Sequence, residues 1–253
     1  MKHLYFIFIT LLLISCSSTK KAGLSAHTYK SQDGNPLLYN IYYPDEYHAK
    51  GAKLPLFIWL HGAGERGDDN VAQLIHIAPY LASDMVQKKY PSIILVPQCP
   101  ENDYWAPIKR TEWTIINEGE VTAPMSKLIA LIQQIMHDPK VDKSRIYIGG
   151  LSMGGFGTLD LISRKPEWFA AATPICGGAD LTKVANFKDI PLWIFHGAKD
   201  PVVPVSLSHD LVKALEKHGV RPKYTEYPEG GHDVWNQAVK EQDYLSWLFQ
   251  QRK

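Results

Sequence analysis

Residues 147–158 read YIGGLSMGGFGT and place one serine, Ser152, among five glycines with aliphatic residues on either side. Ordered glycine costs backbone entropy, so this density of glycine needs a structural reason. A flexible loop, a phosphate-binding loop and a turn too tight for side chains are the three structures to be compared. The residues around the stretch, and the elements that flank it, separate these possibilities.

The pattern fits a sharp strand–turn–helix junction. A P-loop needs a lysine followed by Ser or Thr after the last glycine, and neither is present. A dinucleotide-binding fingerprint would follow the first strand of the fold, whereas these glycines follow a strand in the middle of the chain. Gly150, Ser152 and Gly154 form a G-x-S-x-G motif, in which a strained turn exposes the serine. Gly155 and Gly157 are expected to let the following helix pack closely on the strand.

Short apolar strands alternate with amphipathic helices along the chain, which predicts a mostly parallel sheet covered on both faces. We expect one domain over residues 26–253, an α/β fold with an eight-stranded sheet. The turn QDGNP (32–36) predicts that the first two strands pair antiparallel. Expected strands are 37–44, 54–61, 92–97, 144–150, 170–178, 191–200 and 222–228; expected helices are part of 72–87, with a capping box at Asn70 and Gln73, then 125–138, 153–164, 206–219 and 237–251.

A serine nucleophile needs a base, and the base needs an orienting acid. Asp200 follows a buried strand in WIFHGAKDPVVP (193–204), and His232 follows the last strand in YPEGGHDVW (227–235). The order serine, acid, histidine, each after a strand, matches the G-x-S-x-G architecture. The alternatives are a turn or helix-cap aspartate and a surface histidine. We expect His196 to pack structurally at its strand end.

A serine that attacks a carbonyl carbon forms a tetrahedral intermediate, whose negative oxygen needs two N–H donors. We expect one from the backbone of Met153, at the start of the helix, and the other from Ala63 in the loop HGAG (61–64). His61 is predicted to hold this loop by hydrogen bonds, and Glu65 and Arg66 to brace it through a local ion pair.

The N-terminus predicts export. Lys2 precedes an apolar run from Leu4 to Ile14, which is too short to span a bilayer as a helix but suits a signal peptide over residues 1–15. The ending Leu13-Ile14-Ser15-Cys16 resembles the lipobox of bacterial lipoproteins, which implies lipidation of Cys16. An ordinary signal peptide is the alternative. Residues 16–25 then form a tether, and the protein would be lipid-anchored in a bacterial cell envelope, facing the periplasm or the exterior.

The net charge limits the partners that can be expected, and the positions of the two remaining cysteines limit the possible disulfides. A net charge of +1 gives no general attraction for nucleic acid. Cys99 and Cys176 are placed at the ends of strands separated by two others, about 14 Å apart, so we predict free thiols. The sequence shows no metal-binding His or Cys spacing, and we expect neither metal nor cofactor. The oligomeric state is left open.

Together, WLHGAGERGDDN, VPQCPENDYW, GGLSMGGFGT, FHGAKDPVVP and GGHDVW resemble the α/β-hydrolases over residues 27–251. They resemble in particular the small secreted esterases grouped with feruloyl esterases, acetyl xylan esterases and polyhydroxybutyrate-depolymerase-like proteins. The resemblance implies a serine carboxylesterase acting on acyl esters of plant polysaccharides or similar small esters. No large cap domain is expected, so the site would be an open cleft.

Substrate contacts are assigned to residues on loops near the cleft. Three residues are expected to bind substrate: Trp105, Trp235 and Gln98. Trp113 is expected to lie nearby. The flat aromatic rings of the tryptophans suit a phenolic acyl group or a sugar ring. Two other functions remain open: a serine peptidase of the prolyl-oligopeptidase type, and a non-catalytic surface binding protein on a hydrolase scaffold.

Overall fold

The structure, a computed structural model, describes residues 23–253 except 32–33, 110 and 116–119. Its main sheet has eight strands in the order β1-β2-β4-β3-β7-β8-β9-β10. The strands are β1 (Ser25–Tyr29), β2 (Leu37–Tyr42), β3 (Leu54–Leu60), β4 (Ile93–Gln98), β7 (Val141–Leu151), β8 (Ala171–Ile175), β9 (Trp193–Gly197) and β10 (Lys223–Tyr227). The predicted eight-stranded α/β sheet is confirmed.

Strand direction follows from the connections. β1 and β2 pair antiparallel across the short turn, as predicted, and β2 pairs antiparallel with β4. From β4 onward every neighbouring pair is parallel. The carboxyl ends of the parallel strands therefore meet at one edge of the sheet, where α/β folds place their ligand sites.

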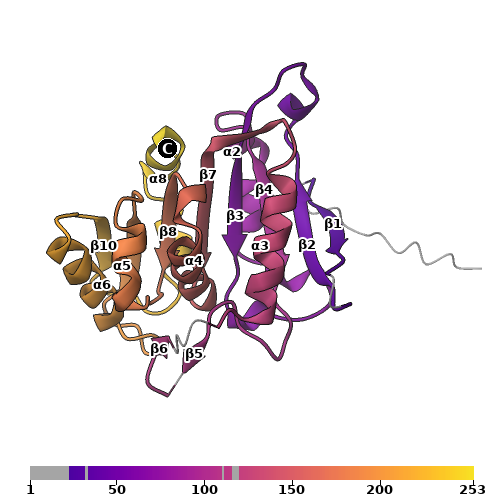
Figure 1. Ribbon diagram of the computed structural model, residues 1–253. Helices are drawn as coiled ribbons and strands as arrows, with labels where there is room; N and C mark the ends of the chain where they lie inside the picture. The colour runs from indigo at the N-terminus through magenta and orange to yellow at the C-terminus, as the bar shows by residue number, and fades with distance from the viewer. Residues whose placement is uncertain (1–22, 32–33, 110, 116–119) are drawn as a thin grey trace, which may run out of the picture.

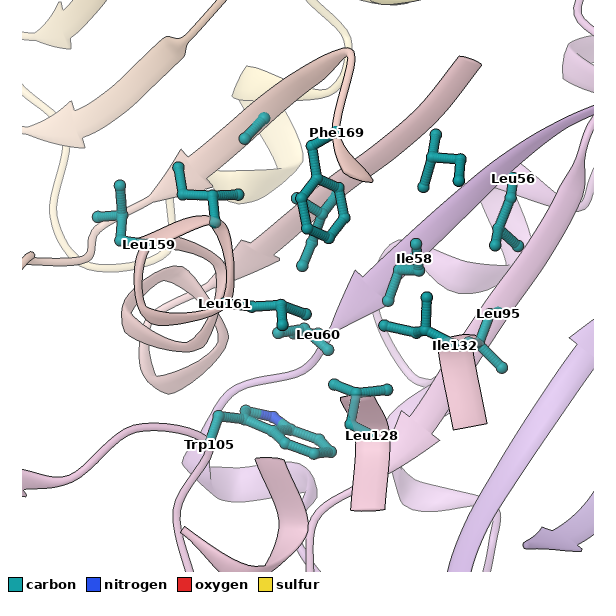
Figure 2. Close-up of a cluster of buried hydrophobic side chains, with 14 of the residues drawn as sticks. Leu56, Ile58, Leu60, Leu95, Trp105, Leu128, Ile132, Leu159, Leu161 and Phe169 are labelled. Atoms are coloured by element: carbon teal, nitrogen blue, oxygen red, sulfur yellow. The ribbon is translucent and has the colours of Figure 1, made fainter. Parts of the chain in front are cut away.

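Helices cover both faces of the sheet, because the strands at its centre are apolar on both sides. β3 shows this arrangement: Leu56, Ile58 and Leu60 pack into one buried cluster, while Phe57 and Trp59 pack into the other. The first cluster includes side chains from α3 (Ala123–Ile135), α4 (Met153–Arg164), α5 (Val184–Phe187) and α6 (Ser206–Lys217). Figure 1 shows α3 and α4 against this face, and Figure 2 shows their leucines and isoleucines meeting those of the strands.

The opposite face is covered by shorter helices. These are α1 (Ala78–Leu81), α2 (Asp84–Gln87), α7 (Trp235–Ala238) and α8 (Tyr244–Gln250), preceded by the single turn η3 (Ala72–Leu74). Tyr244 and Leu248 of α8 pack with Trp193 and Phe195 of β9 in the second cluster. The regions expected as helices at 72–87 and 237–251 are thus each divided into shorter pieces.

The division of 72–87 has a local cause. Pro79 is the second residue of α1, and Ser83 adopts an extended conformation (φ −74°, ψ 150°) that separates α1 from α2. The capping box expected at Asn70 and Gln73 is wrong: their side chains bond to each other at 2.6 Å. The Asp69 carboxylate instead accepts the N–H groups of Val71 and Ala72, which starts η3.

A small hairpin follows β4 and was not expected from the sequence. It pairs β5 (Ile108–Lys109) with β6 (Thr114–Ile115) and lies at the bottom of the view in Figure 1. Its turn carries Trp113 at a positive φ of 52°. The hairpin is separate from the main sheet and lies at the edge where the parallel strands have their carboxyl ends.

The predictions on the N-terminal residues and the cysteines differ in outcome. The signal peptide at 1–15 and Cys16 lie outside the described residues. None of the helices in the described part of the chain combines the length and the apolar character needed to span a bilayer. Cys99 and Cys176 are both buried free thiols, as predicted.

Candidate active site

The turn between β7 and α4 holds Ser152 in a strained conformation. Its φ of 53° and ψ of −117° lie outside the regions that L residues favour. A side chain on Gly150 would begin 2.4 Å from the Gly154 carbonyl oxygen, and one on Gly154 would begin 2.1 Å from the Leu60 carbonyl oxygen. The two glycines of the motif are therefore required by the close approach of backbone to backbone.

The next two glycines clear space for different neighbours. A side chain on Gly155 would begin 2.6 Å from the Ile175 carbonyl oxygen, so this glycine brings α4 against the end of β8, as expected. One on Gly157 would begin 2.5 Å from Cβ of Trp105. It would also lie 3.1 Å from Cδ1 of Leu60, so Gly157 makes room for β3 as well as for the segment after β4.

Three side chains from separate loops form one hydrogen-bonded chain at the carboxyl edge. His232 Nε2 lies 2.9 Å from Ser152 Oγ, and His232 Nδ1 lies 2.7 Å from Asp200 Oδ2. The Asp200 carboxylate is fully buried, whereas the His232 side chain is 18% exposed. The sequence-predicted serine, acid and histidine are brought together in the predicted order.

The loops that carry the acid and the histidine are joined by backbone contacts. The N–H of Ala198 donates to the Tyr227 carbonyl, and that of Lys199 donates to the Gly230 carbonyl, both at 2.9 Å. A side chain on Gly197 would begin 2.1 Å from the Gly231 carbonyl oxygen. This close packing fixes the distance between Asp200 and His232.

The surroundings of Asp200 keep it ionised. Burial raises the pKa of its carboxyl, but hydrogen bonds from His196, from His232 and from the N–H groups of Val203 and Val202 outweigh burial and lower the pKa far below its usual range. An ionised carboxylate at this position holds the proton of His232 on Nδ1 and leaves Nε2 free to accept from Ser152.

The two residues assigned to the oxyanion site, Ala63 and Met153, lie beside Ser152 in the cleft wall. Met153 is the first residue of α4 and Ala63 is the first of the turn η2 (Ala63–Glu65), so neither N–H has an acceptor within its own helix. Both residues line the same cleft as Ser152 and His232. The assignment of these two N–H groups to an oxyanion hole stays a prediction.

His61 anchors the Ala63 loop, as predicted. Its Nε2 accepts the Cys99 N–H at 2.9 Å, so the ring proton resides on Nδ1, which donates to the Gly62 carbonyl at 2.6 Å. Burial lowers the pKa of His61 to about 4 and keeps the ring neutral. The ring therefore ties the end of β4 to the loop after β3.

Glu65 and Arg66 also hold this loop, but not through each other. Arg66 Nε donates to the Ala63 carbonyl at 2.9 Å, and its guanidinium lies 4.8 Å from the Tyr104 ring centroid. Glu65 instead approaches His76, with Oε1 3.3 Å from Nε2. The expected ion pair is replaced by these separate contacts because the two side chains leave the turn in different directions.

The cleft around Ser152 has a volume of about 200 Å³, and its wall contains both polar and apolar residues. Its members are Gly62, Ala63, Gly64, Glu65, Tyr104, Ile108, Trp113, Leu151, Met153, Phe156, Val202, His232 and Trp235. Trp113 stacks on Phe156, with ring centroids 6.0 Å apart and planes 20° apart. Trp235 meets His232 edge to face at 5.5 Å. The predicted positions of Trp235 and Trp113 near the nucleophile are thus confirmed.

The expected positions of Trp105 and Gln98 in the cleft are wrong. The Trp105 indole is fully buried in the core, beside Leu60 and Leu128 (Figure 2). Its neighbour Tyr104 faces the cleft instead. Gln98 is 1% exposed, and its amide accepts from Asn70 N–H and donates to Asp69 and to the Glu65 carbonyl. Gln98 therefore fastens the loop after Ala63 rather than touching substrate.

Several cleft residues were missed by the sequence analysis, including Tyr104, Ile108, Phe156 and Val202. Phe156 stands four residues after Ser152, one helical turn along α4, and this spacing places it on the same side of the helix as the nucleophile. That spacing could have identified it. Tyr104 and Val202 lie in irregular segments, and Ile108 lies in the two-residue strand β5, which is too short to give a periodic signal.

Comparison with known proteins agrees with this geometry. A profile of the family described as phospholipase/carboxylesterase matches residues 47–246. The chain belongs to this family. It is a carboxylesterase-type α/β-hydrolase, and the predicted fold class is confirmed.

Individual relatives are also esterases by name. A probable carboxylesterase of Oryza sativa subsp. japonica is 25% identical over 76% of this chain and 86% of its own length. A probable feruloyl esterase C of Aspergillus niger is 24% identical over 79% of this chain and 68% of its own. A solved thermostable esterase is 38% identical with a TM-score of 0.85; the match covers 92% of this chain but only 64% of that protein.

Proposed function

We propose that the chain is a serine carboxylic-ester hydrolase that works through an acyl-enzyme on Ser152. The observation that carries this proposal is the chain of hydrogen bonds from Asp200 Oδ2 through His232 to Ser152 Oγ, at 2.7 Å and 2.9 Å. It begins at a fully buried carboxylate and ends at a serine held in a strained turn. This is the geometry in which a neutral imidazole activates a hydroxyl.

The proposed reaction has two halves. In the first, His232 Nε2 takes the Ser152 proton as Oγ bonds to the ester carbonyl carbon, and Asp200 stabilises the imidazolium. The tetrahedral intermediate then breaks its bond to the alcohol oxygen, which leaves with the proton from His232. In the second half, water gives a proton to His232 and attacks the acyl-enzyme, and Ser152 Oγ regains the proton as the acid departs.

Charge on the carbonyl oxygen is assigned to the N–H groups of Ala63 and Met153. Both lie on the cleft wall with Ser152, and Met153 opens α4, whose N-terminal dipole also favours negative charge. The loop bearing Ala63 is fixed by His61 and Arg66, so its N–H is oriented before substrate arrives. The mechanism requires neither a metal nor an organic cofactor.

We propose acyl esters of plant polysaccharides, feruloyl or acetyl, or similar small esters as substrates. The stacked Trp113 and Phe156 rings, together with Ile108, give one part of the cleft wall an aromatic and apolar character suited to a phenolic acyl group. The similarity to a probable feruloyl esterase supports the same substrate class.

Hydrolysis of p-nitrophenyl acetate by the wild type and by Ser152→Ala tests the proposed nucleophile. We expect the variant to lose at least about 10³-fold in kcat/KM, since triad members act as a unit. Retention of full activity by Ser152→Ala would refute the assignment. Methyl ferulate, acetylated xylan and a proline amide compared at equal enzyme concentration then rank the substrates; faster cleavage of the amide would favour the peptidase alternative.

We further propose that the mature protein is attached to a membrane of the bacterial cell envelope through lipid on Cys16, with residues 16–25 as a polar tether. Support for this proposal comes from the lipobox-like sequence before Cys16. More than one acyl chain makes such an attachment stable.

A further inference from the structure

A second histidine, His196, contacts the acid of the proposed triad and has no part in the mechanism above. It is the fourth residue of β9, is completely buried, and precedes Asp200 by four positions. Its Nδ1 lies 2.7 Å from Ser208 Oγ, and its Nε2 lies 3.0 Å from the Val203 carbonyl oxygen and 3.3 Å from Asp200 Oδ2.

These partners fix the tautomer of His196. A backbone carbonyl oxygen only accepts, so Nε2 must carry the proton that points to Val203. Ser208, itself buried in α6, then donates its hydroxyl proton to the lone pair on Nδ1. The same Nε2–H faces Asp200 Oδ2, the oxygen that also accepts from His232 Nδ1. One carboxylate oxygen thus lies between two imidazole rings.

We propose that His196 is a positioning residue for Asp200, through which Ser208 and α6 hold the carboxylate in the plane and orientation that His232 needs. The inference rests on the proposed serine mechanism. Val202 and Val203 N–H groups hold the other carboxylate oxygen, Oδ1, at 2.8 Å and 2.9 Å. Without His196, the side-chain donors left to the carboxylate among the described residues are His232 and the Cys176 thiol, which is a weak donor, and rotation of the carboxylate about Oδ1 becomes easier.

The titratable groups around the ring are consistent with a neutral, donating His196. The Cys176 thiol has its sulfur within 4.8 Å of the His196 and Asp200 ligand atoms, and burial raises its pKa, which keeps it protonated. Glu226 of β10 pairs with His196 in the strand register, and its own side chain bonds to Tyr224 and His209. Both ring nitrogens of His196 are occupied by hydrogen bonds, so the cluster of Cys176, His196 and Asp200 is internally satisfied rather than open to a metal ion.

The test compares His196→Leu, which removes the donor, with His196→Gln, whose amide can again donate toward Asp200. For p-nitrophenyl acetate we expect His196→Leu to lower kcat by about tenfold to a hundredfold with KM nearly unchanged, because a small misplacement of a catalytic group has an effect of that size. His196→Gln should recover most of the loss. The acid limb of the kcat/KM profile should move to higher pH in His196→Leu, because the carboxylate charge of Asp200, no longer shared with His196, then stabilises the imidazolium form of His232 more strongly.

A spectroscopic measurement makes the test independent of turnover. The far-downfield proton resonance of His232 Nδ1–H should shift or broaden in His196→Leu and return toward the wild-type position in His196→Gln. Ser208→Ala offers a second variant should the leucine variant fail to fold: it should lower kcat by about threefold to tenfold in the same direction. Adding Ser208→Ala to His196→Leu should cause no further loss, since both act through one chain of contacts.

The matched control is His209→Gln, one position after Ser208 on α6, whose side chain is 41% exposed and pairs with Glu226. Its kcat should stay within about twofold of wild type, as for most surface substitutions. An unchanged kcat and resonance in His196→Leu would overturn the inference, as would equal losses in the Leu and Gln variants with wild-type pH profiles. Failure of the serine mechanism itself is recognised separately, because wild-type activity would then survive Ser152→Ala.

Discussion

At the scale of single residues, His61 shows how a titratable side chain is made structural. Its ring is 1% exposed and bridges the Cys99 N–H and the Gly62 carbonyl, which ties the loop bearing Ala63 to the end of β4. A proton on Nε2 would leave the Cys99 N–H facing another N–H. The neutral state that burial favours is therefore also the one that the hydrogen bonds require.

This predicts a pH dependence of folding. The folded pKa of His61 is about 4, below its ordinary value of 6.5, so the unfolded chain binds the proton more readily. The stability contributed by the neutral ring is fully present above about pH 6.5 and is lost as the pH falls toward about 4, which amounts to about 2 kcal/mol between pH 7 and pH 5.

Urea unfolding of the wild type and of His61→Gln at pH 7 and pH 5 measures this dependence. Both free energies of unfolding will fall toward pH 5 through other groups, but the wild type should lose about 2 kcal/mol more than the variant. Equal changes in the two proteins would show that His61 is not held neutral by the fold. Subtracting the variant's change in unfolding free energy from that of the wild type leaves the contribution of His61, because the other histidines are the same in both proteins.

At the scale of elements, the β5–β6 hairpin brings an aromatic surface to the cleft. Trp113, in its turn, stacks on Phe156 of α4, and Ile108 of β5 lies on the same wall. The hairpin has no role in the main sheet, and it touches the cleft through these apolar side chains. We therefore expect it to influence which acyl groups are accepted rather than the chemistry at Ser152.

Replacing Trp113 by Ala tests whether the hairpin affects the choice of acyl group without affecting the chemistry at Ser152. The kcat/KM for methyl ferulate should fall by about threefold to tenfold, as expected for the loss of an aromatic pair, while that for p-nitrophenyl acetate should change by less than about twofold. Steady-state kinetics of the variant and the wild type on both esters give the ratio of the two kcat/KM values. A loss of the same size on both substrates would instead assign the hairpin a structural role.

The same elements show why the sequence predicted some of the site and not the rest. Ser152, Asp200 and His232 were found because each lies shortly after the end of a parallel strand, β7, β9 and β10 respectively, and strand ends are fixed by the sheet. Trp105 was misplaced because it lies in an irregular segment, where no periodicity tells which of two adjacent aromatic residues points outward. There Tyr104 faces the cleft, while Trp105 fills the space that Gly157 leaves in α4.

At the scale of the whole molecule, the site depends on the parallel order of β7, β9 and β10. Each strand delivers one of the three side chains at the same edge, and backbone bonds between the last two loops hold them in register. The antiparallel pair β1–β2 closes the opposite side of the sheet and carries no part of the cleft. In the proposed attachment, residues 16–25 would lead into β1, so lipid on Cys16 would leave the elements around the cleft unconstrained.

This arrangement predicts that anchoring and catalysis can be separated. Cys16→Ser removes the thiol that would carry lipid, so the variant should leave the membrane fraction, while its kcat/KM for p-nitrophenyl acetate should stay within about twofold of wild type. Expression in a bacterial host, separation of membranes by ultracentrifugation and activity assays on both fractions give the result. Ser17→Ala, adjacent in the tether, is the matched control and should remain with the membranes. If Cys16→Ser also sediments with the membranes after a high-salt wash, the anchor lies elsewhere in the chain, because charge-mediated adhesion of a protein with a net charge of +1 would not survive that wash.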